Sequence, residues 1–200
     1  MPRTCIKHPI NYLVMSLLLL SGCATFSGKP QPEVSPQVSQ AYQRALSSMK
    51  AGKDKQAIKQ FRQLSKTSPL LSGPHTNLGI LYLKLKSVKQ AEQSLQKAIE
   101  LNPENRIAYN YMGIIYRKLG RFDEAEKAYL KAIELDNDYS YAHLNLGILY
   151  DLYISDLQKA LSHYEKYQSL TDKSDKMVNK WIVDIQRRDT ANNKLEANEG

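Results

Sequence analysis

Apolar residues recur along most of this chain at the spacing of an amphipathic helix. Leu78 and Tyr82 are four positions apart, and Met112 and Tyr116 repeat the same spacing further along the chain. Residues at i, i+3 and i+4 lie on one face of a helix, so the pattern predicts helices that each bury a single stripe. The sequence therefore predicts an all-α protein.

The helical pattern itself repeats every 34 residues. Alanine, glycine, tyrosine and isoleucine positions keep this step: Ala57, Ala91 and Ala125 (with Ala160 one residue late), Gly79, Gly113 and Gly147, Tyr82, Tyr116 and Tyr150, and Ile80, Ile114 and Ile148. Self-similarity at this length is typical of stacked helix–turn–helix units, because each unit needs a neighbour to cover its apolar face. Small residues let the two helices of a unit approach closely, and large residues fill the space between them.

The order of these residues resembles the tetratricopeptide repeat. Three copies carry the pattern: His75, Leu78, Gly79, Tyr82, Ala91, Leu95, Ala98 and Pro103; Tyr109, Met112, Gly113, Tyr116, Gly120, Ala125, Tyr129 and Ala132; His143, Leu146, Gly147, Tyr150, Ala160, Tyr164 and Tyr167. A degenerate copy precedes them. The resemblance implies an α-solenoid of about four hairpins, over residues 39–71, 72–105, 106–139 and 140–172. One extra residue in the turn around Tyr153 to Asp156 predicts that the second helix of the last hairpin is slightly displaced from the register of the family.

Residues with strong end preferences mark several helix boundaries. Ser35 before Pro36, and Asn102 before Pro103, are predicted as an N-cap followed by a first-turn proline. Gly120 is predicted to end its helix in the left-handed conformation. Beyond the repeats, we expect a capping helix over residues 173–189, with Val178, Trp181, Ile182 and Ile185 as its apolar stripe, and a disordered polar tail over 190–200.

The start of the chain has the organisation of an export sequence. A basic segment with Arg3 and Lys7 precedes an apolar core, Tyr12 to Leu20, that is too short to span a bilayer. Leu-Ser-Gly-Cys follows and resembles the lipobox of bacterial lipoproteins. The resemblance implies a signal peptide over residues 1–22 and acylation of Cys23. The alternative is an ordinary cysteine after a conventional signal peptide.

Two further expectations follow from a lipidated Cys23. In enterobacteria-like systems, the absence of aspartate after the cysteine implies export to the periplasmic side of the outer membrane. Residues 23–38, which include Pro30, Pro32 and Pro36 among Ser and Gln, are predicted to be a tether rather than a domain.

The resemblance also implies where a protein partner binds, because the first helix of each repeat lines the concave groove in this family. The lining residues implied in this chain are Leu46, Ile80, Leu83, Asn110, Ile114, Arg117, Leu144 and Ile148. Such an apolar surface suits an amphipathic helix or an extended apolar segment. The alternative is that the chain itself covers this surface, through its C-terminal helix or by self-association.

Charge is concentrated in the first repeat. The chain has a formal net charge of +8, and residues 39–72 contain seven basic residues, Arg44, Lys50, Lys53, Lys55, Lys59, Arg62 and Lys66, against the single acid Asp54. The surface is either an ordinary solvated face or a patch for a membrane or an acidic partner. Nucleic acid is not expected, because aromatic residues are not interleaved with the basic ones.

No residues have the pattern of a catalytic centre. His75, His143 and His163 lack a histidine or cysteine at metal-ligand spacing, and glycine-rich phosphate loops are absent from the sequence. We expect no enzyme activity, cofactor, metal or small-molecule substrate. The function that the resemblance implies is a membrane-anchored interaction scaffold that assists an envelope complex of the type IV pilus or secretin kind. The alternative is an accessory subunit of a polysaccharide-export or cell-wall enzyme complex.

Overall fold

The computed structural model describes residues 34–171 and 175–199, with side chains up to residue 191. All regular structure in these residues is helical. The elements are α1 (Pro36–Lys50), α2 (Asp54–Thr67), α3 (Ser72–Lys84), α4 (Val88–Leu101), α5 (Arg106–Lys118), α6 (Phe122–Leu135), α7 (Ser140–Leu149), the π-helical turn η1 (Tyr150–Ile154), α8 (Leu157–Ser169) and α9 (Lys176–Glu199).

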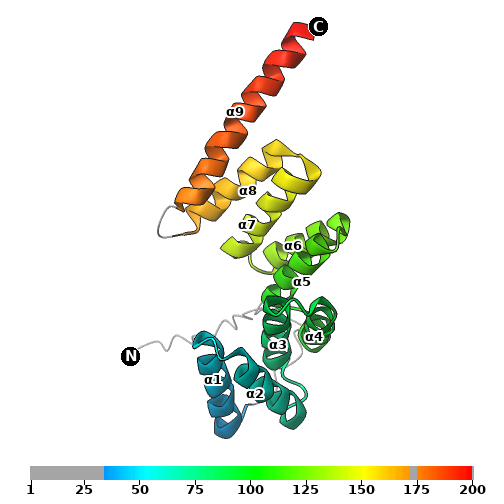
Figure 1. The fold of residues 1–200 in the computed structure, drawn as a ribbon, viewed down its shortest axis with the longest axis vertical. Coiled ribbons are helices and arrows are strands. Elements are labelled where there is room, and N and C mark those ends of the chain that lie inside the picture. Colours follow the sequence, from blue (N-terminus) through cyan, green and yellow to red (C-terminus); the bar gives the residue numbers. More distant parts are fainter. Residues whose placement is uncertain (1–33, 172–174, 200) are drawn as a thin grey trace, which may run out of the picture. The chain divides into compact units, whose positions relative to one another are not determined.

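Consecutive helices form four hairpins, α1–α2, α3–α4, α5–α6 and α7–α8 (Figure 1). Each hairpin packs on the next through its second helix, and the first helices α3, α5 and α7 also contact one another in order. This arrangement confirms the prediction of an α-solenoid of helix hairpins.

Small residues permit the close packing inside each hairpin. A Cβ atom on Gly113 would lie 2.5 Å from the ring of Tyr129, and one on Gly147 would lie 2.6 Å from the ring of Tyr164. Ala91 and Ala125 are completely buried on the facing helices. The glycine and alanine positions of the 34-residue pattern are therefore where two helices meet most closely.

All four turns inside the hairpins use a left-handed residue at the same repeat position. Gly52 (φ 70°) and Gly120 (φ 73°) are glycines, which tolerate this conformation, and the prediction for Gly120 is confirmed. Lys86 (φ 60°) and Ser155 (φ 64°) take the equivalent positions, although side chains disfavour them there. The turn geometry is thus set by the hairpin and not by the residue type.

The first helix begins where the sequence indicates, but one other predicted helix start is wrong. The Ser35 hydroxyl accepts a hydrogen bond from the Val38 amide at 3.4 Å, so α1 begins at Pro36, inside the predicted tether. Asn102 and Pro103 instead lie in the turn between α4 and α5. The cap of α5 is Asn105, whose side-chain oxygen accepts from the Ala108 amide at 3.0 Å.

The extra residue of the last repeat is accommodated in η1. This π turn follows α7 directly, and the left-handed Ser155 then leads to the N-cap Asp156 of α8. A π turn takes up one additional residue without breaking the helix. The second helix α8 can therefore begin after the same type of turn as α2, α4 and α6.

Helix α9 begins at Lys176, inside the region predicted as a capping helix, and continues to Glu199, so residues 190–199 of the predicted disordered tail are helical in the structure. Ala, Asn, Lys, Leu and Glu can extend an existing helix, because propagation is much easier than nucleation. Val178 and Ile185 of α9 are buried, and Trp181 packs against Tyr164 with ring centroids 5.5 Å apart.

Candidate functional site

Four aliphatic side chains form the centre of the predicted partner-binding groove, and we call them the aliphatic row: Leu46, Ile80, Ile114 and Ile148. They lie on α1, α3, α5 and α7, the first helices of the four hairpins, and all four are half-buried. Leu46 packs against the core cluster of the first hairpins, and Ile114 and Ile148 pack against that of the last two. The row therefore contributes to the core and still has accessible apolar surface.

The other predicted groove residues differ in accessibility. Leu83 and Leu144 are half-buried like the aliphatic row, and the half-buried Arg117 has its guanidinium 5.8 Å from the centroid of the Tyr153 ring. Asn110 is only 2 % exposed, and its side-chain oxygen accepts a hydrogen bond from Asn145 at 3.0 Å. Asn110 thus connects α5 to α7, and its side chain is not accessible to a partner.

Hydrogen bonds between side chains link successive hairpins on several helices. Asn77 of α3 donates to the Tyr42 hydroxyl of α1 at 2.7 Å. Asn105 donates to Ser72 and Thr76 of α3, at 2.7 and 2.8 Å. Buried polar groups that find partners fix the geometry of the elements carrying them. These bonds hold the helices of the aliphatic row at a defined spacing.

The C-terminal helix covers the last hairpin. Among the described helices, α9 packs on α8 and does not run back along α1, α3 and α5. Arg188 pairs with Asp151 of η1 at 2.5 Å, and the Asp151 side chain is only 7 % exposed. Asp151 occupies the repeat position of Arg117, so at the last repeat this position is filled by a contact within the chain.

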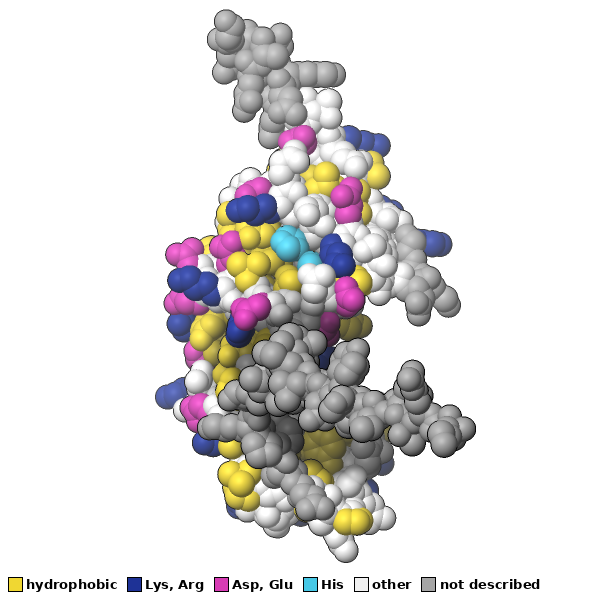
Figure 2. All heavy atoms as spheres, turned by 180° about the vertical axis from the view of Figure 1, so that it is seen from behind, with side chains coloured by type: hydrophobic (Ala, Val, Ile, Leu, Met, Phe, Trp, Pro, Cys, Tyr) yellow, Lys and Arg dark blue, Asp and Glu magenta, His cyan; other side chains and the backbone are white. Residues whose placement is uncertain are grey.

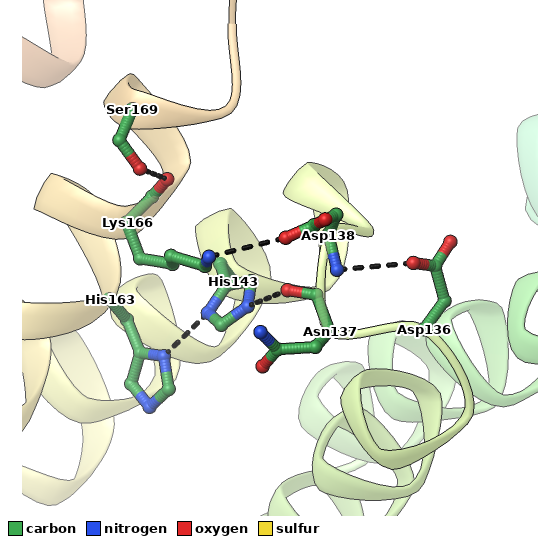
Figure 3. Close-up of polar contacts among 7 residues, drawn as sticks. All are labelled: Asp136, Asn137, Asp138, His143, His163, Lys166 and Ser169. Carbon is green, nitrogen blue, oxygen red and sulfur yellow. Dashed lines mark hydrogen bonds and ion pairs between the residues drawn. The ribbon is translucent and has the colours of Figure 1, made fainter.

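A pair of histidines, His143 of α7 and His163 of α8, was not expected from the sequence. Their Nδ1 atoms lie 3.0 Å apart, and His143 Nε2 lies 3.1 Å from the carbonyl oxygen of Asn137 (Figure 3). Because a carbonyl can only accept, His143 Nε2 carries a proton and its Nδ1 is the acceptor when the ring is neutral. His163 Nδ1 then donates. Pairing within the helix hairpin brings these rings together, although they are 20 residues apart.

The surroundings of the histidine pair favour its neutral form. Burial is the main cause that lowers the pKa of His163 to about 4, assisted by His143 and the Lys159 cation. Burial also lowers the pKa of His143. The Tyr150 ring stacks on His163 with centroids 5.7 Å apart, and Lys166 pairs with Asp138 at 3.2 Å beside His143 (Figure 3).

Within the described residues, groups of three or more His, Cys, Asp and Glu that could hold a metal ion are absent. The same residues contain no helix with the length and apolarity needed to cross a bilayer. Cys23 lies outside the part of the chain that the structure describes.

A hollow between hairpins lies away from the predicted groove. It has a volume of about 290 Å³ between α4, α5 and α6, and its apolar lining includes Ile99, Met112 and Tyr116. Sequence reasoning missed this hollow, because its lining residues belong to the core pattern and their exposure depends on how the hairpins stack.

Charged side chains are interspersed around apolar patches on the face drawn in Figure 2. Ion pairs link one hairpin to the next: Lys84–Asp54 at 2.8 Å, Arg121–Glu92 at 3.4 Å and Lys166–Asp138 at 3.2 Å. A further pair, Arg106–Asp136 at 2.8 Å, joins the two ends of the third hairpin. Exposed pairs of this kind contribute at most about 1 kcal/mol each. These ion pairs therefore add little to the stability of the array.

Family models match the middle of the chain. Residues 74–105 and 94–127 each match a tetratricopeptide repeat model, and residues 113–151 match a further TPR repeat model. Together these matches extend from residue 74 to residue 151, so this segment is similar to tetratricopeptide repeats. No curated protein sequence matches the chain.

Solved structures share the fold. A structure described as the functional characterization of Pseudomonas aeruginosa pilF has a TM-score of 0.69 and 22 % identity, over 77 % of this chain and 69 % of that chain. A thermophilic TPR protein of Thermus thermophilus has a TM-score of 0.64 and 24 % identity, over 74 % and 81 %. MamA from Desulfovibrio magneticus RS-1 has a TM-score of 0.65 and 16 % identity, over 79 % and 88 %.

Proposed function

We propose that this chain is a non-catalytic protein-interaction scaffold, attached to a membrane of the bacterial cell envelope through an acylated Cys23. Its tetratricopeptide repeats hold a protein partner and assist the assembly or localisation of an envelope complex. The context that we propose is a pilus or secretin assembly at the outer membrane. The fold shared with pilF of Pseudomonas aeruginosa is compatible with this context.

The observation that carries the proposal is the aliphatic row on α1, α3, α5 and α7. Its members are neither fully buried nor fully exposed, and they recur once in each hairpin. Side-chain hydrogen bonds fix the spacing of the helices that carry them, so the row is organised before a partner arrives. A regularly spaced apolar surface of this kind fits the apolar face of a helix or an extended segment.

Substitution of Ile114 by Asp tests the groove, because it puts a charge at the centre of the row. The partner is captured by crosslinking and pull-down of the lipidated protein from envelope membranes. We expect Ile114→Asp to lose the partner and to keep its helical circular dichroism. Leu130→Asp is the matched control, since Leu130 is an exposed apolar residue (43 %) on α6, outside the row.

The outcome is informative even if Ile114→Asp unfolds. Ile80→Ala and Ile114→Ala remove apolar surface without adding a charge, and they should weaken capture in proportion to the surface lost. Undiminished capture by a folded row variant would refute the groove. Recovery of glycan-synthesis or cell-wall enzymes, instead of pilus or secretin components, would favour the role of an accessory subunit.

The lipid anchor is tested separately by labelling growing cells with palmitate. We expect the wild-type protein to be labelled and to fractionate with the outer membrane, and Cys23→Ser to lose the label. An unlabelled wild-type protein would refute the anchor and leave the groove proposal unaffected.

A further inference from the structure

The outer face of α2 carries a line of basic residues. Lys55, Lys59, Arg62 and Lys66 follow one another at steps of four, three and four, so they lie along one side of the helix, and all are exposed. We call these residues the basic stripe. Ala57, Phe61 and Leu64 occupy the buried side of the same helix. From first to last, the stripe covers about 16 Å at the rise of an α-helix.

The equivalent positions in the other three hairpins show that the stripe is not a property of the repeat. They are Lys89, Gln93, Gln96 and Glu100 on α4; Asp123, Lys127, Leu130 and Glu134 on α6; and Gln158, Ser162, Glu165 and Ser169 on α8. This face is neutral on α4 and slightly acidic on α6 and α8. Four cations on this face are therefore not required for a repeat to be soluble, and among the four hairpins only the first has them.

Acidic groups of the described residues do not neutralise the stripe. The one acid of the hairpin, Asp54, is paired with Lys84 of α3 at 2.8 Å. Arg62 donates from Nε to the Tyr82 hydroxyl at 2.8 Å, and this bond holds its guanidinium against the array. Lys55, Lys59 and Lys66 have no ion-pair partner in the described part of the chain. Four like charges in a row keep a surface attractive to anions.

An exposed apolar edge adjoins the stripe at the end of α2. Leu70, four residues after Lys66, is 65 % exposed, and Val34 is 45 % exposed. Both line a hollow of about 270 Å³ together with Val38, Pro69 and Leu71. Cations beside exposed aliphatic side chains are typical of surfaces that lie in the headgroup region of a bilayer.

We propose that the basic stripe and the Leu70 edge dock the first hairpin onto an anionic phospholipid surface. The choice of a bilayer over an acidic protein depends on the lipid anchor of the proposed function. Only eleven residues lie between Cys23 and the N-cap Ser35, so the two are at most about 43 Å apart in a fully extended chain. An acylated Cys23 would keep the first hairpin closest to the headgroups. The stripe is on a second helix and the aliphatic row is on first helices, so the two surfaces can be occupied together.

The test uses residues 24–200 without the acyl chains, because an attached lipid would hide the contribution of the stripe. Residues 32–200 form one unit by their own contacts, so this chain retains the complete array. Cosedimentation is measured with phosphatidylcholine vesicles, with and without about one third phosphatidylglycerol, at low and high salt. The variant Lys55→Gln/Lys59→Gln/Lys66→Gln leaves Arg62 and its bond to Tyr82 intact. The control Lys89→Gln/Lys118→Gln/Lys127→Gln removes the same charge from other exposed positions.

We expect binding that needs phosphatidylglycerol and weakens with salt. Each cation near an anionic surface strengthens binding about five-fold, so the stripe variant should bind at least about tenfold more weakly, while the control stays near wild type. Leu70→Ser should weaken binding without changing its salt dependence. Equal losses in the stripe variant and the control, or no binding to anionic vesicles, would overturn the proposal. An acidic envelope protein that is retained through the stripe, while vesicles are not, would overturn it too. These results do not bear on partner capture by the aliphatic row.

Discussion

The histidine pair predicts that acid destabilises the last hairpin. Burial, His143 and Lys159 lower the pKa of His163 to about 4 in the folded chain, whereas the unfolded value is about 6.5. Between these two pH values the unfolded chain binds more protons than the folded chain. Neutral His163 therefore contributes to the free energy of unfolding in full above about pH 6.5, and this contribution is lost as the pH falls towards 4.

The geometry of the pair sets the size of the effect. With His143 Nε2 committed to the Asn137 carbonyl, two charged rings would place two N–H groups against each other across 3.0 Å. The pair can therefore accept one additional proton but not two. The difference in the pKa of His163 would correspond to about 3 kcal/mol for a fully buried ring. His163 is only half-buried, so we expect about 1 kcal/mol between pH 7.5 and pH 5.

Urea unfolding followed by circular dichroism measures this effect at a series of pH values. We expect wild type to lose about 1 kcal/mol more free energy of unfolding on acidification than His163→Gln, which removes the titrating ring. His75→Gln is the control on another hairpin and should keep most of the wild-type dependence. Parallel pH profiles for wild type and His163→Gln would refute the reasoning, because all other titrating groups are common to both chains.

Three substitutions test other features of the fold. Lys86→Gly should raise the free energy of unfolding by about 0.5–1 kcal/mol, because it removes the strain of a residue with a Cβ in the left-handed conformation. Lys86→Ala keeps the Cβ and should give no such gain, and the midpoints of urea unfolding compare the two variants. Gly113→Ala should cost about 1–3 kcal/mol in the same assay, since its Cβ would lie 2.5 Å from the buried Tyr129 ring, and unchanged stability would contradict that contact. Arg188→Gln leaves the 7 % exposed Asp151 without its cation; α9 should exchange its amide hydrogens faster, and unaltered exchange would show that the pair does not hold the helix.

Much of the fold could be predicted from the sequence because its determinants are local and repeated. Gly113 and Ala125 indicated where the helices of a hairpin approach, and the structure has both residues buried at that contact. A single glycine would have been ambiguous, but the same step in three hairpins removes the ambiguity. The left-handed conformation of Gly120 could also be predicted, since glycine commonly ends a helix in this conformation.

Two kinds of feature could not be predicted: which of two nearby residues caps a helix, and which side chains from different helices meet. Asn102 and Asn105 are both good caps, and the structure uses Asn105 because Asn102 instead accepts a hydrogen bond from the Glu104 amide in the turn. Asn110 was expected at an accessible groove position, but its partner Asn145 comes from the next hairpin. The histidine pair likewise depends on the rotation of α8 against α7. Such contacts follow from packing between elements, on which periodicity gives no information.

The insertion in the last repeat links its local structure to the end of the array. Inside the array, the first helix of each following hairpin covers the apolar face of the previous one, and at the end α9 does so through Val178 and Ile185. The additional residue forms η1, which carries Asp151 at the point where Arg188 of α9 meets it. Arg117 at the equivalent position of the preceding hairpin carries the opposite charge and could not bind an arginine. Among the four residues at this repeat position, Met49, Leu83, Arg117 and Asp151, only Asp151 is acidic, so the contact with Arg188 of α9 is specific to the last hairpin.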